Sequence, residues 1–99
     1  MAHSMIADDM AIFAKVVEMN GFTAASRVLG VPKVRVSRSV AQLERALGVR
    51  LLERTTRRIA LTVAGRSILV HCQRVALEAE AAVLQLERLR RLRDVIDGL

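Results

Sequence analysis

Apolar residues recur every three or four positions in the first half of the chain, a spacing typical of helices that bury one face. In the first such stretch they are Ile6, Met10, Phe13 and Val17. Asp8 and Asp9 place carboxylates near its start, where they favour a helix. Asn20-Gly21 predicts its end, because both residues tolerate left-handed backbone angles. The segment MAHSM, residues 1–5, looks like a vector-derived leader and is left out of the fold expectation.

Two further helices are expected before residue 50. Thr23 is a favourable N-cap for a short helix that Gly30 closes. Pro32 opens a third helix, which runs to Leu47 and stops at Gly48. At 100° per residue, the core face of this third helix holds Val36, Val40, Leu43 and Leu47. Two short helices joined by a tight glycine-containing turn are typical of a helix-turn-helix.

The second half predicts a small hairpin and one long helix. VRLLER and IALT are two short extended segments around the turn TTRR, an arrangement called a wing. Thr62 is the expected N-cap of a helix that continues to about Arg93. Its apolar residues alternate spacings of four and three, which predicts a helix–helix seam and a homodimer. The seam residues are Ile68, Cys72, Val75, Ala79, Ala82, Leu86 and Leu89.

The expected fold is therefore mainly α. Residues 6–61 form a winged helix-turn-helix of three helices and a two-stranded wing, and residues 62–93 form a long dimerisation helix. Residues 94–99 would begin a linker. No apolar run approaches the ~20 residues needed to span a membrane. No membrane partner is therefore expected.

Positive charge is concentrated in the middle of the chain. Residues 23–66 hold ten basic and two acidic side chains, a net charge of +8, although the whole chain has +6. Of the 16 cationic residues, 14 are arginines, which suit bidentate contact with phosphate or guanine. The absence of Trp and Tyr argues against a stacking platform for single strands. The expected partner is double-stranded DNA.

Candidate base-reading residues lie on the third helix, opposite its core face. Lys33, Val34 and Ser37 belong to the N-terminal turns that enter the major groove in helix-turn-helix proteins, where Val34 would touch a thymine methyl. Arg38 would contact a phosphate or a guanine. Arg35 lies on a flank, so it would reach either a base or the backbone.

Enzymatic and metal-binding functions find little support in the residues. One of the two histidines lies in the leader, and His71 and Cys72 are adjacent on a helix, so their side chains diverge. Nothing has metal-ligand spacing or a glycine-rich phosphate loop. No catalytic residue, metal or cofactor is expected, and a single cysteine suits a cytoplasmic protein.

FAKVVEMNGFTAASRVLGVPK, followed by VSRSVAQLERALGVRLLERTTRRIALTVAG, resembles the LysR-type transcriptional regulators of bacteria over residues 8–90. The resemblance implies a nucleoid-associated regulator that binds partly palindromic promoter sites, with the long helix paired antiparallel to its twin. It places base reading at Lys33, Val34, Ser37 and Arg38. It places phosphate or minor-groove contacts at Thr23, Arg38, Arg54, Arg57 and Arg58.

Two departures from this family pattern change the expectation. Small or polar residues are usual at Val34 and Arg35, so either the operator is unusual or Arg35 adds a backbone contact. Family members also continue into an effector-binding domain, so an isolated DNA-binding fragment is expected, whose small-molecule effector would act through an absent domain. Two alternatives stay open: a coiled-coil interaction module with only non-specific DNA affinity, and a winged-helix DNA binder of another family, such as the MarR type.

Overall fold

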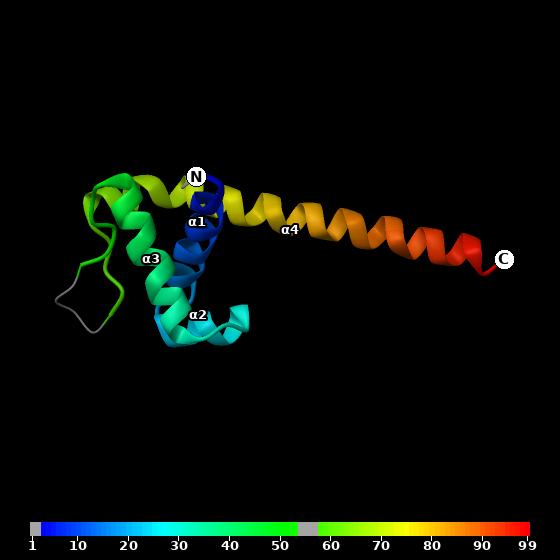
Figure 1. The fold of residues 1–99 in the computed structure, drawn as a ribbon, viewed down its shortest axis with the longest axis horizontal. Coiled ribbons are helices and arrows are strands. Elements are labelled where there is room, and N and C mark those ends of the chain that lie inside the picture. The colour runs from blue at the N-terminus through cyan, green and yellow to red at the C-terminus, as the bar shows by residue number, and fades with distance from the viewer. Residues whose placement is uncertain (1–2, 54–57) are drawn as a thin grey trace.

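The described residues of the computed structural model, 3–53 and 58–99 with side chains from Ile6 onward, form four helices. These are α1 (His3–Glu18), α2 (Phe22–Leu29), α3 (Lys33–Leu47) and α4 (Val63–Asp97). α1 packs against α2, α3 and α4, and α2 also packs against α3. α1 packs against the first part of α4, α2 lies on the far side of the domain from α4, and the remainder of α4 projects away from the other helices (Figure 1). The molecule is consequently elongated, with extents of 60 × 26 × 22 Å.

The helix ends follow local chemistry. Gly30 and Gly48 adopt left-handed φ angles of 68° and 72° directly after α2 and α3, as the sequence predicts. Pro32 is the N-cap of α3 rather than its first residue. Thr62 caps α4, because its Oγ1 accepts a hydrogen bond from Gly65 N at 3.0 Å. The predicted ends of α2 and α3 and the predicted start of α4 are confirmed.

Three other helix boundaries differ from the expectation. α1 begins at His3, inside the segment 1–5, because no glycine or proline interrupts the helix there. α2 begins at Phe22, which packs against the core, so Thr23 lies within the first turn and makes no side-chain cap. α4 continues beyond Arg93 to Asp97, since the next helix-breaking residue is a glycine.

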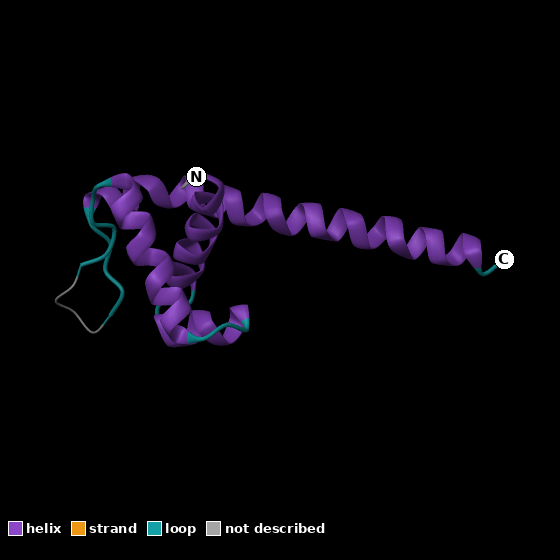
Figure 2. Ribbon diagram, in the orientation of Figure 1, coloured by secondary structure: helices purple, strands orange, loops and turns teal. Residues whose placement is uncertain are grey.

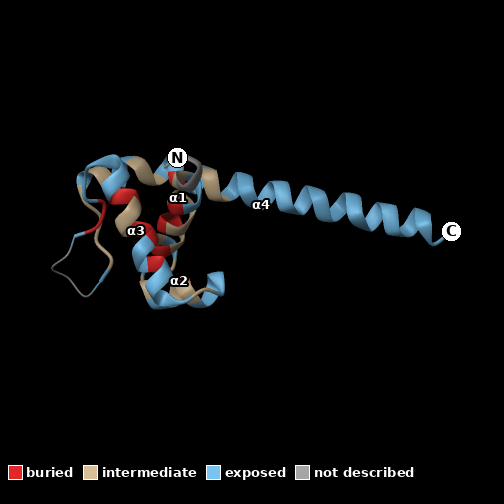
Figure 3. Ribbon diagram, viewed as in Figure 1, coloured by how far each residue is buried: buried red, intermediate tan, exposed pale blue. Residues whose placement is uncertain are grey.

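The hydrophobic core lies where α1, α3, the segment 51–52 and α4 meet (Figure 3). Its largest fully buried side chains are Phe13, Val16, Val36, Val40, Leu43, Leu51 and Cys72. Leu47 was expected on this face but is 38% exposed, because it ends α3 just where the chain turns away from the core.

The described residues contain the two paired arms of the expected wing but no strand. Leu52 and Leu61 form an isolated antiparallel bridge, and Glu53 N donates to Ala60 O at 2.8 Å. Thr62 N also donates to Leu51 O, and the described parts of the two arms are loops (Figure 2). The predicted contact residues Arg54 and Arg57 lie outside the described residues.

α4 changes character along its length. Cys72 is fully buried and Val75 and Ala76 are half-buried, whereas every residue from Leu77 onward is exposed. None of the described helices combines the length and the apolarity that a membrane span requires. α4 therefore has one part that belongs to the domain and one part that lies free of it.

Candidate nucleic-acid interface

The first half of α3 has two sharply different sides. Val36, Ser39 and Val40 are buried against the domain. The exposed side chains are those that the sequence predicts to reach DNA: Lys33, Val34, Arg35, Ser37 and Arg38. Val34 is 62% exposed and lies among these polar side chains. The helix therefore presents a mixed apolar and cationic surface rather than a purely charged one.

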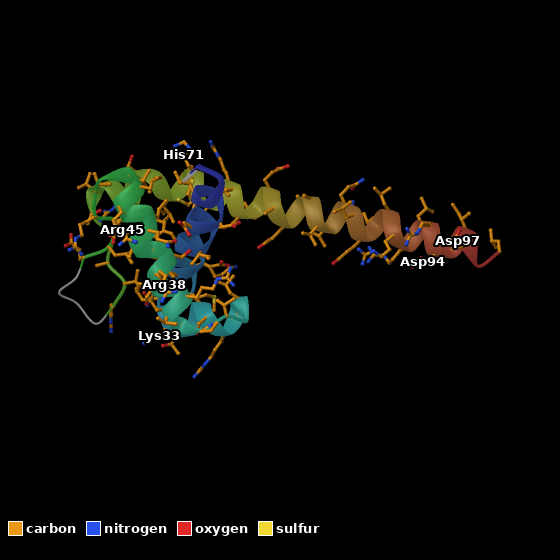
Figure 4. All side chains as sticks on the ribbon, in the orientation of Figure 1. Lys33, Arg38, Arg45, His71, Asp94 and Asp97 are labelled. Carbon is orange, nitrogen blue, oxygen red and sulfur yellow. The ribbon has the colours of Figure 1, made fainter. Side chains whose placement is uncertain are left out.

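The cations of α3 are available to a ligand. In the part of the chain that the structure describes, no ion pair involves Lys33, Arg35 or Arg38. Lys33 and Arg38 lie toward the α2 end of the helix, and Arg45 lies toward the opposite end (Figure 4). The two groups of cations are consequently well separated along α3.

A hollow of about 460 Å³ brings three elements together next to Lys33. It is lined by the turn and first residues of α2, by Lys33 and by Ile59 of the second wing arm. Thr23, a predicted phosphate contact, lies in this lining and is exposed. Arg27 also lines the hollow, although it was not among the predicted contacts. It follows Thr23 by four residues and so lies on the same face of α2. The hollow joins predicted contacts from α2 and α3.

A set of hydrogen bonds, which we call the wing joint, connects the end of α3 to the wing and to α4. It comprises Glu44, the segment 50–52, Thr62 and Gly65. The buried carboxylate of Glu44 accepts from Leu51 N at 2.8 Å and from Leu52 N at 3.3 Å. Thr62 Oγ1 donates to Arg50 O at 2.6 Å, and Thr62 N donates to Leu51 O at 3.0 Å. The wing arms, one of which leads to exposed Arg58, are thereby fixed to α3.

A second polar contact is buried between α1 and α3. Ser39 Oγ donates to Asp9 Oδ1, and both residues are only 6% exposed. From the sequence, Asp9 was expected near the start of the first helix, and no role was predicted for Ser39. The sequence did offer one indication: Ser39 lies next to the apolar stripe of α3 on the helical wheel.

No catalytic or metal centre emerges from the described residues. Cys72 is buried in the core, and this burial raises the pKa of its thiol to about 11, which makes it a poor nucleophile. His71, its neighbour, is exposed. Among the described residues, no three His, Cys, Asp or Glu side chains gather as a metal site would require.

The seam predicted along α4 divides into two parts. Ile68 and Cys72 pack against the core of their own chain, so Cys72 is a core residue rather than part of a surface seam. Val75 is half-buried, and the seam continues over exposed Ala79, Ala82, Leu86 and Leu89. These last residues carry no tertiary contact that would cover them. Their role as a dimer interface stays a prediction.

A family model described as a bacterial regulatory helix-turn-helix protein of the lysR family matches residues 7–66, which include all of α2 and α3. The chain belongs to the LysR family. The exposed side of α3, the hollow and the wing joint all lie within residues 7–66 of this match. The resemblance seen in the sequence is thereby confirmed.

Two relatives illustrate this LysR membership. A protein named HTH-type transcriptional regulator from Xanthomonas campestris pv. campestris (strain 8004) is 54% identical over 90 residues, covering 88% of this chain and 26% of that protein. The HTH-type transcriptional activator AaeR of Escherichia coli (strain K12) is 46% identical over 71 residues, covering 72% of this chain and 23% of that one. The chain thus spans about a quarter of the length of these curated relatives.

Solved structures of LysR-type proteins have the same fold. The chain in a BenM_DBD/catB site 1 DNA complex superposes with a TM-score of 0.72 at 27% identity, covering 85% of this chain and 94% of that one. CbnR, a LysR family transcriptional regulator, gives a TM-score of 0.66 at 34% identity, covering 85% of this chain and 28% of that one. The first of these similar chains is in complex with DNA.

Proposed function

We propose that this chain binds double-stranded DNA sequence-specifically, as the DNA-binding part of a bacterial transcriptional regulator. The observation that carries the proposal is the exposed side of α3, where Lys33, Val34, Ser37 and Arg38 stand free above a buried apolar stripe. Membership of the LysR family and the DNA complex of a similar chain support it. Relatives named as an activator and as a repressor both exist, so the direction of regulation does not follow from this domain.

In this proposal α3 enters the major groove through its N-terminal turns. Lys33 and Arg38 donate hydrogen bonds to guanine or phosphate acceptors, and Ser37 pairs with a base edge. Val34 packs against a thymine methyl group, which only an exposed apolar side chain can do without a desolvation penalty. Arg35 lies at the flank of the groove, where it reaches either a base or the backbone.

Backbone contacts would flank the recognition helix on two sides. Thr23 and Arg27 line the hollow beside Lys33, at the start of α2, where backbone N–H groups favour an anion. Arg58 precedes the second wing arm and would contact the minor groove. Arg54 and Arg57, which lie outside the described residues, are proposed as further contacts from the sequence alone. These contacts hold the protein on DNA and carry little sequence information.

Binding to a random duplex at two salt concentrations tests DNA binding itself. If about four cations neutralise phosphates, raising monovalent salt from about 50 to about 200 mM weakens binding about 100-fold, because condensed counterions are no longer released as favourably. Fluorescence anisotropy of a labelled duplex measures the change. Binding that is absent or indifferent to salt would instead favour a protein-interaction module.

Removing a base-reading side chain should damage discrimination more than affinity in general. Ser37→Ala or Lys33→Ala is expected to weaken the preferred site by about 10- to 100-fold and a random duplex by much less. The preferred site comes from selection out of a random library. Arg45→Ala is the matched control, since Arg45 is exposed on the same helix but at its far end. Equal losses on both duplexes would show that these two side chains do not read bases.

We also propose that the chain pairs with a second copy through the exposed part of the α4 seam. Leu86 and Leu89 are 62% and 54% exposed, and a free leucine stripe on a helix of this length favours a partner helix. A dimer matches a partly palindromic operator with two recognition helices. Any small-molecule effector would act through a domain outside these 99 residues.

Charge placed in the seam should abolish this pairing. Leu86→Glu together with Leu89→Glu is expected to halve the mass measured by sedimentation equilibrium, because each chain would have to bury two unpaired carboxylates in an apolar seam. Glu87→Gln, on the same turn but off the seam, should leave the mass unchanged. A mass unaffected by the double substitution would remove the seam from the interface.

A further inference from the structure

The hydrogen bond between Asp9 and Ser39 lies directly behind the DNA-facing side of α3. Ser39 follows the exposed Arg38 and precedes the buried Val40. Its Oγ donates to Asp9 Oδ1 on α1, thirty positions earlier in the chain. The contact therefore joins α1 to the part of α3 that carries the candidate base-reading residues.

The hydrogen bond between Asp9 and Ser39 is expected to add little to the free energy of unfolding. A buried polar pair can often be replaced by apolar residues of similar volume without loss of stability, since its desolvation offsets most of its attraction. Packing along the rest of the contact already comes from Val36, Val40 and Leu43, which are fully buried. Aliphatic packing, however, is non-directional and tolerates a small rotation of one helix against another. A hydrogen bond is directional and does not.

We propose that Asp9 is a positioning residue for DNA reading: its hydrogen bond to Ser39 fixes the rotation of α3 about its own axis. The inference rests on the proposed function, because it assumes that the exposed side of α3 reads bases. Side-chain tips lie roughly 5–6 Å from a helix axis, so a rotation of about 20° moves them by about 2 Å. Base recognition needs placement to within about 0.5 Å.

The position of the pair along α3 matters for this role. Ser39 lies two residues after Ser37 and six after Lys33, so it constrains the N-terminal turns that face the groove. The far end of α3 is held separately, through Glu44 at the wing joint. Loss of the Asp9–Ser39 contact would therefore reorient the reading turns without releasing the wing.

The test compares discrimination with stability in the 99-residue chain. The double variant Asp9→Leu/Ser39→Ala replaces both polar groups by apolar ones. We expect its thermal midpoint to stay equal or rise, while the ratio of affinities for the preferred and the random duplex falls about tenfold, as when one base contact is misaligned. Asp9→Asn is the matched control, because its amide oxygen still accepts from Ser39 Oγ. We expect its ratio to stay within about twofold of wild type.

Three results would overturn the inference. The double variant could keep the wild-type ratio, or Asp9→Asn could lower the ratio as much as the double variant does. If the double variant does not fold, the affinities of Ser39→Ala for the same two duplexes are measured under conditions in which it is folded. An unchanged ratio of these affinities is the third result that would overturn the inference. Failure of the proposed function is distinguishable, since the wild-type chain would then prefer no duplex at all.

Discussion

Replacing Gly65 with alanine is expected to lower the free energy of unfolding by about 3 kcal/mol, in the range seen when a well-packed interior is overfilled. A Cβ atom at this position would lie 2.1 Å from Leu51 O, a backbone atom that cannot move aside as a flexible side chain does. Leu51 O also accepts from Thr62 N at 3.0 Å, so its displacement would disturb the cap of α4. Urea denaturation followed by circular dichroism measures the change.

A loss of stability would be informative, because helix propensity alone predicts that Gly65→Ala raises the free energy of unfolding. Alanine is favoured over glycine inside a helix by up to about 1 kcal/mol, and Gly65 is helical. Gly21→Ala is the control: its φ of 165° is ordinary extended backbone, and its Cβ would meet no atom within 4 Å. A Gly65→Ala protein as stable as the wild type would mean that α4 approaches the wing less closely than described.

Truncating Glu44 to alanine is expected to have a similarly large effect, about 3 kcal/mol, because it leaves the N–H groups of Leu51 and Leu52 without their carboxylate acceptor in a buried site. The loss should be larger than that of Glu44→Gln, whose amide oxygen can still accept one of the two bonds. Both variants are compared with wild type by urea denaturation.

The same substitution tests whether the wing joint serves DNA binding. At a temperature at which Glu44→Ala remains folded, the salt dependence of its binding to a random duplex should become shallower, since Arg58 would no longer be held at the backbone. Arg50→Ala is a suitable comparison, because Thr62 bonds its backbone oxygen and not its side chain. A Glu44→Ala protein with wild-type stability would show that these hydrogen bonds contribute nothing net.

Much of the fold could be predicted because it depends on local chemistry. The ends of α2 and α3 follow from glycines that adopt left-handed angles, and the start of α4 follows from the Thr62 side chain. Boundaries that depend on tertiary contacts were placed less well. Phe22 packs on the core and brings the start of α2 forward, so Thr23 is not a cap. The wing has a single bridge where two strands were expected.

The candidate site likewise has residues that local periodicity predicts and residues that only tertiary packing brings together. Helical periodicity alone separated the exposed Val34, Ser37 and Arg38 from the buried stripe, because 100° per residue determines which side chains share a face. Helical periodicity could not predict the buried hydrogen bond between Asp9 and Ser39, because these residues meet only when α1 and α3 are packed. Arg27 was missed for a related reason: its place beside Lys33 depends on how α2 meets α3.

The free part of α4 has a consequence for how the molecule gains its order. A solitary helix in water is only marginally stable, even when favourable i, i+4 pairs such as Glu87 and Arg91 support it. From Leu77 onward every residue of α4 is exposed, so its own chain supplies little packing for this part of the helix. Its helical content should therefore rise with protein concentration, as association supplies the packing that one chain lacks. Under the proposed pairing, the compact domain folds within one chain, whereas the exposed part of α4 gains its order only when two chains associate.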